Sequence, residues 1–125
     1  MSSEKTISMI NKMGERVCTV SIPDDPTLFI EQSKSARKKI EFVVIEKLRQ
    51  ISIAADGTSP ENAETIQAAE KEVLSLFDGL FGDGVGLIIF HRNRPFSAVK
   101  GRFFCSVVLE TLVSRIVFEY NNSIK

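Results

Sequence analysis

The sequence is poor in histidine and cysteine, two residue types that often serve as metal ligands and catalytic groups. It has no Trp, one His and two Cys among 125 residues. His91 has no Cys or carboxylate at metal-ligand spacing, so no metal site is expected. Cys18 and Cys105 have neither a CxxC partner nor a nearby base, which leaves nucleophilic catalysis without its usual residues. Both lie in apolar runs and are predicted to be buried free thiols.

Phosphate-binding and membrane signatures are also missing. The glycines at 82, 84 and 86 follow a predicted helix and match neither GxGxxG nor a P-loop. No apolar run reaches the roughly 18 residues that span a bilayer. Residues 1–10 do not combine a basic start with an apolar stretch, as a signal peptide would. We therefore expect a cytoplasmic, non-enzymatic protein with no catalytic residues, no cofactor and no membrane partner.

The length predicts a single domain, residues 1–125, with one hydrophobic core. The formal net charge is zero, but the charge is divided into blocks. Residues 31–55 carry six basic and three acidic side chains, residues 56–83 one and seven, and residues 84–125 six and two. Either oppositely charged helices of one chain pack together, or copies of the chain present complementary surfaces to each other.

The N-terminal part, residues 5–22, has the pattern of a β-hairpin. Residues 11–14 end in a glycine and form the predicted turn. After it, apolar and polar residues alternate with the period of a half-buried strand: Cys18, Val20 and Ile22 alternate with Thr19 and Ser21.

Two long amphipathic helices are predicted next, over 26–54 and 60–81. Asp25 is a suitable N-cap for the first, with Pro26 at its first position. Ser59 and Pro60 repeat this pattern for the second, and Gly82 is the expected stop. Apolar residues recur at three- and four-residue spacing in both: Phe29, Ala36, Ile40, Val43, Val44, Leu48 and Ile51, then Ala63, Ile66, Ala69 (or Ala68), Val73, Leu76, Phe77 and Leu80.

Residues 84–90 fit either a short helix capped by Asp83 or a buried strand, and the compact connection favours the helix. After a loop at 91–95, a last helix is predicted over about 96–120, with Ser97 as its cap. The sequence thus predicts a mainly α fold, a minor α+β type, with an N-terminal β-hairpin and three to four helices in 26–120.

The last predicted helix is apolar on two faces, more than one buried stripe requires. It is either central in the domain or covered by a partner. In the second case, the residues expected at a partner or oligomer interface are Phe104, Val108, Val113, Val117 and Tyr120.

A short basic cluster offers anion contacts: Arg92, Arg94, Lys100 and Arg102. A nucleic-acid surface usually has a wider basic face, so nucleic acid is an unfavoured partner. A small nucleic-acid-binding regulator and a structural subunit of another assembly remain as alternative functions. The acidic helix 60–81 could equally well meet these arginines.

Residues 70–90 resemble the tail assembly chaperones of long-tailed siphophages. In that family an acidic helix ends in a Phe-Asp-x-Leu/Val-Phe-Gly-Asp/Glu-Gly pattern, followed by a short segment ending in Ile-Phe, a loop and a C-terminal helix. The matching residues here are Phe77, Asp78, Leu80, Phe81, Gly82, Asp83, Gly84, Ile89 and Phe90. Phe77 and Phe81 are expected in the core, and Gly82 and Gly84 at the turn.

The resemblance implies a helical, non-catalytic chaperone without a cofactor, located in the bacterial host cytoplasm. Its implied partner is the tape measure protein, a very long helical protein that the chaperone keeps soluble during tail assembly. It also implies self-association into a homo-oligomer.

Overall fold

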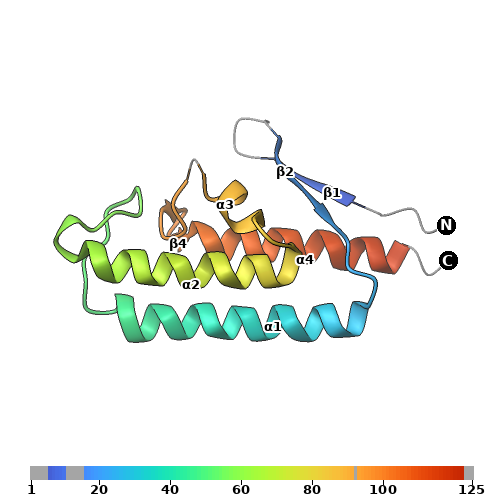
Figure 1. Ribbon diagram of the computed structural model, residues 1–125, viewed down its shortest axis with the longest axis horizontal. Coiled ribbons are helices and arrows are strands. Elements are labelled where there is room, and N and C mark those ends of the chain that lie inside the picture. The colour runs from blue at the N-terminus through green and yellow to red at the C-terminus, as the bar shows by residue number, and fades with distance from the viewer. Residues whose placement is uncertain (1–5, 11–15, 92, 123–125) are drawn as a thin grey trace.

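Three long helices lie side by side and form most of the molecule (Figure 1). The computed structural model describes residues 6–10, 16–91 and 93–122. In this part of the chain the fold is mainly helical, with four α-helices, three of them long, and a small two-stranded antiparallel sheet in the C-terminal region. Helix α1 (Pro26–Val43) runs antiparallel to both α2 (Ala63–Phe81) and α4 (Phe104–Asn122) (Figure 1).

Helix α1 begins as predicted, because the Asp25 carboxylate accepts a hydrogen bond from the Leu28 amide at 3.1 Å. It ends earlier than residue 54. A π-helical turn, Val44–Leu48, follows it, and the next residues leave the helix. Val43 and Leu48 are both buried and five residues apart, the spacing of one π-helical turn. Ser33 on α1 is buried despite being polar, and its hydroxyl donates to the Ile30 carbonyl.

Helix α2 ends at Gly82, as predicted, with φ at +118°. Its start differs from the prediction. A 3-10 turn, Pro60–Asn62, comes first, and Ser59 occupies its N-cap position with Pro60 next, but the Ser59 hydroxyl makes no capping hydrogen bond. The Ser59 hydroxyl instead donates to the Ser52 carbonyl at 2.7 Å, which connects the two ends of the loop between the first two long helices.

The segment after Gly82 is helical, so the predicted short helix is confirmed as α3 (Val85–Ile89). Gly84 precedes it with φ at +85°, and Asp83 gives no side-chain cap. The capping carboxylate comes from α2, where Asp78 Oδ1 accepts the Gly86 amide at 2.8 Å.

The predicted start of the last helix at 96 is wrong. A small sheet, β3 (Ala98–Val99) paired with β4 (Arg102–Phe103), occupies this stretch, and α4 starts at Phe104. Lys100 and Gly101 both have positive φ, as a two-residue hairpin turn requires. Ser97 is therefore not an N-cap. Its carbonyl accepts the Phe104 amide, and the Pro95 carbonyl accepts the Cys105 amide, so two amides at the start of α4 have acceptors outside the helix.

Near the N-terminus, β1 (Thr6–Ile10) pairs antiparallel with β2 (Arg16–Ser21), with an irregularity between Met9 and Ile10. The predicted turn at 11–14 lies outside the described residues. Val20 of β2 is buried in the core, so this strand is anchored to the helices.

The buried residues form one cluster between the long helices. Much of it is a chain of ring contacts with centroids 5.0–6.2 Å apart: Tyr120–Phe29–Phe81–Phe77–Phe90–Phe104. Rings from α1, α2, α4 and the end of α3 therefore share one core, which fixes the positions of the surface residues below.

Candidate functional site

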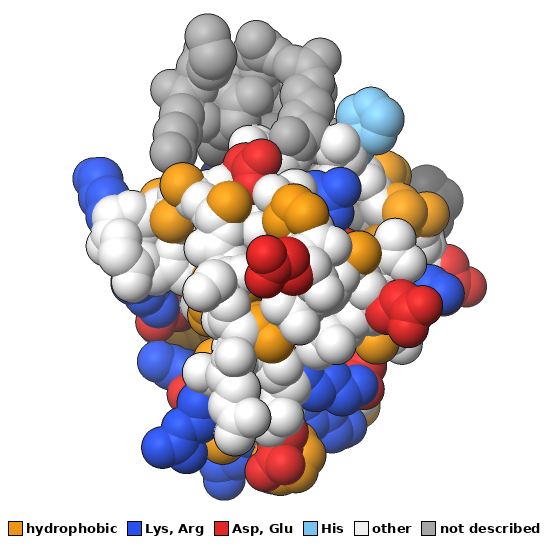
Figure 2. Space-filling model, turned by 90° about the vertical axis from the view of Figure 1, so that its left-hand side faces the viewer, with side chains coloured by type: hydrophobic (Ala, Val, Ile, Leu, Met, Phe, Trp, Pro, Cys, Tyr) orange, Lys and Arg blue, Asp and Glu red, His pale blue; other side chains and the backbone are white. Residues whose placement is uncertain are grey.

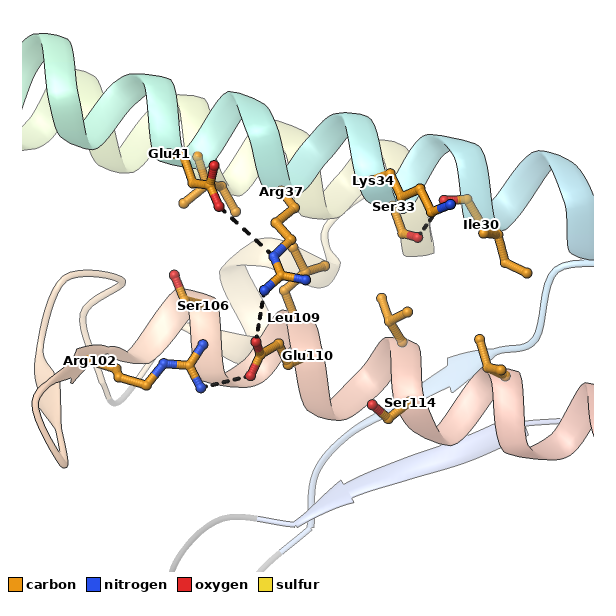
Figure 3. A pocket seen from close by; sticks show the side chains of 13 residues that line it. Ile30, Ser33, Lys34, Arg37, Glu41, Arg102, Ser106, Leu109, Glu110 and Ser114 are labelled. Carbon is orange, nitrogen blue, oxygen red and sulfur yellow. Dashed lines mark hydrogen bonds and ion pairs between the residues drawn. The ribbon is translucent and has the colours of Figure 1, made fainter.

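Helices α1 and α4 leave a groove of about 420 Å³ between them (Figure 3). Its lining comes only from these two helices and from Arg102 of β4, which lies just before α4. The lining residues are Ile30, Ser33, Lys34, Arg37, Ile40, Glu41, Arg102, Ser106, Leu109, Glu110, Val113, Ser114 and Val117.

The groove, called the α1–α4 groove below, has an apolar floor and small polar edges. Leu109, Val113 and Val117 follow one another at four-residue spacing on α4, and Val113 and Val117 are half-buried. Ser106 and Ser114 flank them on the same helix, and their short side chains leave space that larger residues would fill. The floor is therefore open to another apolar surface.

An ion-pair network crosses the middle of the groove (Figure 3). Arg37 of α1 contacts Glu110 of α4 at 3.2 Å, and Arg102 contacts the other oxygen of Glu110 at 2.7 Å. Arg37 also lies 4.0 Å from Glu41. The hydrogen bond from Arg102 lowers the pKa of Glu110, and the same bond raises the pKa of Arg102. All of these groups are exposed, so the bridge is weak and easily opened.

The residues predicted for an interface do not lie together. Val113 and Val117 line the groove. Val108 is 1% exposed and belongs to the core, so its assignment to an interface is corrected: it lies on the inner side of α4. Phe118, which sequence reasoning did not single out, is exposed on the same helix.

The two aromatic residues of that prediction face the core cluster instead. Phe104 is half-buried, with its ring 5.8 Å from that of Phe90. The Tyr120 hydroxyl donates to the Pro23 carbonyl at 2.6 Å, and its ring meets Phe29 edge-on. Burial and the nearby Asp25 and Asp24 raise the pKa of Tyr120, which keeps the hydroxyl a donor. Tyr120 thus connects α4 to the chain before α1.

The motif residues have structural positions. Phe77 and Phe81 are buried in the core, as expected, and Gly82 and Gly84 form the turn with positive φ. Asp78 binds the start of α3. A Cβ at Gly86 would lie 2.7 Å from the Leu74 carbonyl oxygen, so α3 can approach α2 this closely only with glycine there.

The basic cluster is divided among different partners. Arg94 binds both oxygens of Glu70 on α2, at 3.2 and 3.3 Å. Arg102 is bound to Glu110, and Lys100 lies exposed in the β3–β4 turn. Arg92 lies outside the described residues. The acidic side chains of the same chain thus occupy two of the four predicted anion contacts.

The groove has no Cys or His side chain among its lining residues. The described residues contain no group of three or more His, Cys, Asp or Glu side chains able to hold a metal. Burial raises the pKa of the Cys105 thiol to about 12, so it remains protonated at neutral pH. The side chain of Cys18 lies outside the described part. Among the helices described, none is both long and apolar enough to cross a membrane.

Comparisons with protein-family models, with curated proteins and with solved structures find no match for this chain.

Proposed function

We propose that this protein is a tail assembly chaperone that binds the tape measure protein of a long-tailed phage in the host cytoplasm and keeps it soluble. The proposal begins from the resemblance of residues 70–90 to that family. The observation that carries it is the α1–α4 groove, whose floor holds apolar side chains from two helices.

The groove suits a helical client. An amphipathic helix places apolar side chains at positions i, i+3, i+4 and i+7, and such a stripe can occupy a groove between two helices. Val113 and Val117 supply one wall of the floor and Ile30 the other. Covering these half-buried side chains would remove apolar surface from water on both the client and the chaperone.

The bridge between Arg37 and Glu110 sets a condition on client binding. It crosses the groove, so a bound helix must either displace it or lie along one side of it. Both side chains are largely exposed, and exposed ion pairs contribute little to stability. A client carrying its own carboxylate or guanidinium could replace one partner of the bridge at small cost.

In the proposed function, the acidic helix α2 has a structural role and does not contact the client. Its motif residues fill the core and hold α3, and the client surface lies elsewhere, on α1 and α4. A chaperone that binds its client without catalysis needs only an exposed surface that is complementary to that client. In the proposed function the chain also forms a homo-oligomer, which would present several grooves to one long client.

Co-expression with the tape measure protein encoded in the same genome tests the proposal. We expect the long protein to move from the insoluble to the soluble fraction and to co-purify with this chain. A folded chain that leaves the tape measure protein insoluble and does not bind it would contradict the proposal.

A further inference from the structure

We propose that the α1–α4 groove selects helical clients that carry acidic side chains along one flank of their apolar stripe, and that Lys34 and Arg37 bind these carboxylates. This inference rests on the proposed function and names the chemical class of client that the same groove accepts. It is supported by the unequal charge of the two edges of the groove.

The α1 edge of the groove carries two neighbouring cations. Lys34 and Arg37 both line the groove, and they lie three residues apart on α1, so their side chains are neighbours on one face of the helix. The opposite edge, on α4, carries a single carboxylate, Glu110, between two serines. A helix lying on the apolar floor would therefore have two cations along one of its flanks.

Within the chain, the carboxylates of the groove already have partners, and one cation is left over. Glu110 is contacted by Arg37 at 3.2 Å and by Arg102 at 2.7 Å, and Glu41 lies 4.0 Å from Arg37. In the part of the chain that the structure describes, Lys34 forms no ion pair. The lining thus has three cations and two carboxylates, and a client carboxylate would balance them.

Arg37 can turn to a client without leaving a charge unpaired. Arg102 is the closer of the two partners of Glu110, and its hydrogen bond is the largest cause of the lowered pKa of that carboxyl group. When a bound helix opens the contact between Arg37 and Glu110, Glu110 keeps Arg102, and Arg37 can bind a client carboxylate. Both guanidinium groups are exposed, so this exchange costs little.

A basic or neutral flank fits the groove less well. A basic flank would face Lys34 and Arg37, which repel it, or compete with Arg102 for Glu110. A neutral flank would leave Lys34 without a partner. An acidic flank is therefore the best electrostatic complement to the α1 edge.

The basic character of α1 extends beyond the groove. Residues 31–55 carry six basic and three acidic side chains. Figure 2 shows the end of the molecule at which α1 stops, and lysine and arginine side chains gather in its lower part, where α1 lies in Figure 1. An excess of one sign of charge attracts an oppositely charged segment before contact is made.

Synthetic helical peptides of about 18 residues, or five turns, test the inference with the full wild-type chain. Three peptides share one leucine stripe and differ at two flanking positions, four residues apart, which are both Glu, both Gln or both Lys. A fourth carries Gln at the flank and two Glu on the face opposite the stripe, so its net charge equals that of the Glu-flank peptide. Fluorescence anisotropy at low ionic strength gives each Kd.

We expect the Glu-flank peptide to bind at least about fivefold more tightly than the Gln-flank peptide and the opposite-face peptide. The Lys-flank peptide should bind most weakly. Because the opposite-face peptide has the same net charge, its weaker binding would separate contacts in the groove from general attraction. The preference for the Glu flank should decrease at high salt.

Variants of the chain assign the preference to residues. Lys34→Gln combined with Arg37→Gln should bind the Glu-flank and Gln-flank peptides equally. Lys38→Gln is the matched control, because it removes one charge from the same helix on the side that faces α2, and it should keep the preference. The ratio of the two Kd values isolates the pairing from any change in overall affinity. Circular dichroism establishes that each variant is folded.

Four results would overturn the inference: equal binding of the Glu-flank and Gln-flank peptides by the wild-type chain, equal binding of the opposite-face peptide, a preference that survives in the Lys34/Arg37 variant, or no binding of any peptide. Recovery of soluble tape measure protein is measured separately. A groove that binds its client without charge preference is thereby distinguished from a chain that binds no client.

Discussion

Between α2 and α3 the backbones come so close that a Cβ at Gly86 would lie 2.7 Å from the Leu74 carbonyl oxygen, whereas α1 and α4 leave a groove of about 420 Å³. At the contact between α2 and α3, Gly86 lets the backbones approach, the Asp78 carboxylate accepts the Gly86 amide, and the rings of Phe77 and Phe90 pack together. The α1–α4 groove is crossed only by exposed ion pairs. The conspicuous sequence motif thus builds the closely packed side of the molecule, and the proposed binding surface lies where packing is incomplete.

The largest expected effect is a difference in stability between a substitution on the inner side of α4 and one on its groove side. Val108→Asp would bury a carboxylate in the core and should destabilise the fold by more than about 3 kcal/mol, enough to unfold much of the chain. Val113→Asp, at a half-buried position in the groove, should leave the fold intact. Thermal unfolding followed by circular dichroism compares them. Equal stability of the two variants would contradict the division of α4 into an inner and a groove side.

The second largest effect is expected on the free energy of unfolding when the close approach of α3 to α2 is disturbed. Gly86→Ala should lower the free energy of unfolding by about 1–3 kcal/mol, because the added methyl group meets backbone atoms. Gly79→Ala is the matched control. A Cβ there meets nothing within 4 Å, so it should stabilise α2 by about 0.5–1 kcal/mol. Urea titrations of both variants measure the difference, and a Gly86→Ala protein as stable as wild type would show that α3 is free to shift.

A smaller effect is expected from the carboxylate that holds α3. Asp78→Ala removes the acceptor of the Gly86 amide and should cost about 1 kcal/mol. Asp83→Ala, at the neighbouring acidic residue that gives no side-chain cap, should change the free energy of unfolding little. Hydrogen exchange of the Gly86 amide reports the loss directly. If the Asp83 variant shows the greater loss, the capping role belongs to Asp83.

The smallest effect concerns the bridge across the groove. The pKa of Glu110 is lowered in the folded protein, so its contribution to stability is present above its ordinary pKa and is lost as pH falls through the folded value. Glu110→Gln should therefore lower Tm slightly, by about 1–2 °C at pH 7, with the difference from wild type disappearing in acid. A difference that grows as pH falls would have the wrong sign for this bridge.

Local signals predicted much of the fold. Asp25 with Pro26 gave the start of α1, Gly82 gave the end of α2, and the short apolar run gave α3. The start of α4 was missed because apolar periodicity continues through 96–103. The Lys100-Gly101 pair, which lies between Ala98-Val99 and Arg102-Phe103, was the sequence signal for the β3–β4 turn.

The candidate site was less predictable, because it depends on contacts between distant residues. Val108 and Val113 are equally apolar in sequence, and only the packing of α4 against the other helices separates them. The pairing of Arg37 with Glu110, 73 residues away, has no local signature. The early end of α1 was likewise missed, because Leu48 and Ile51 continue the three- and four-residue apolar spacing beyond the last α-helical residue, Val43.

Co-expression of groove variants with the client gives the sharpest test of the proposal that the α1–α4 groove binds a helical client. The tape measure protein from the same genome is co-expressed with the wild-type chain, with Val113→Asp combined with Val117→Asp, or with Leu87→Asp, which alters an exposed apolar residue on α3. Recovery of soluble client bound to the chain is quantified. We predict that the groove variant folds but recovers at least about tenfold less client, while the α3 variant equals wild type. Undiminished recovery by the folded groove variant would contradict the claim.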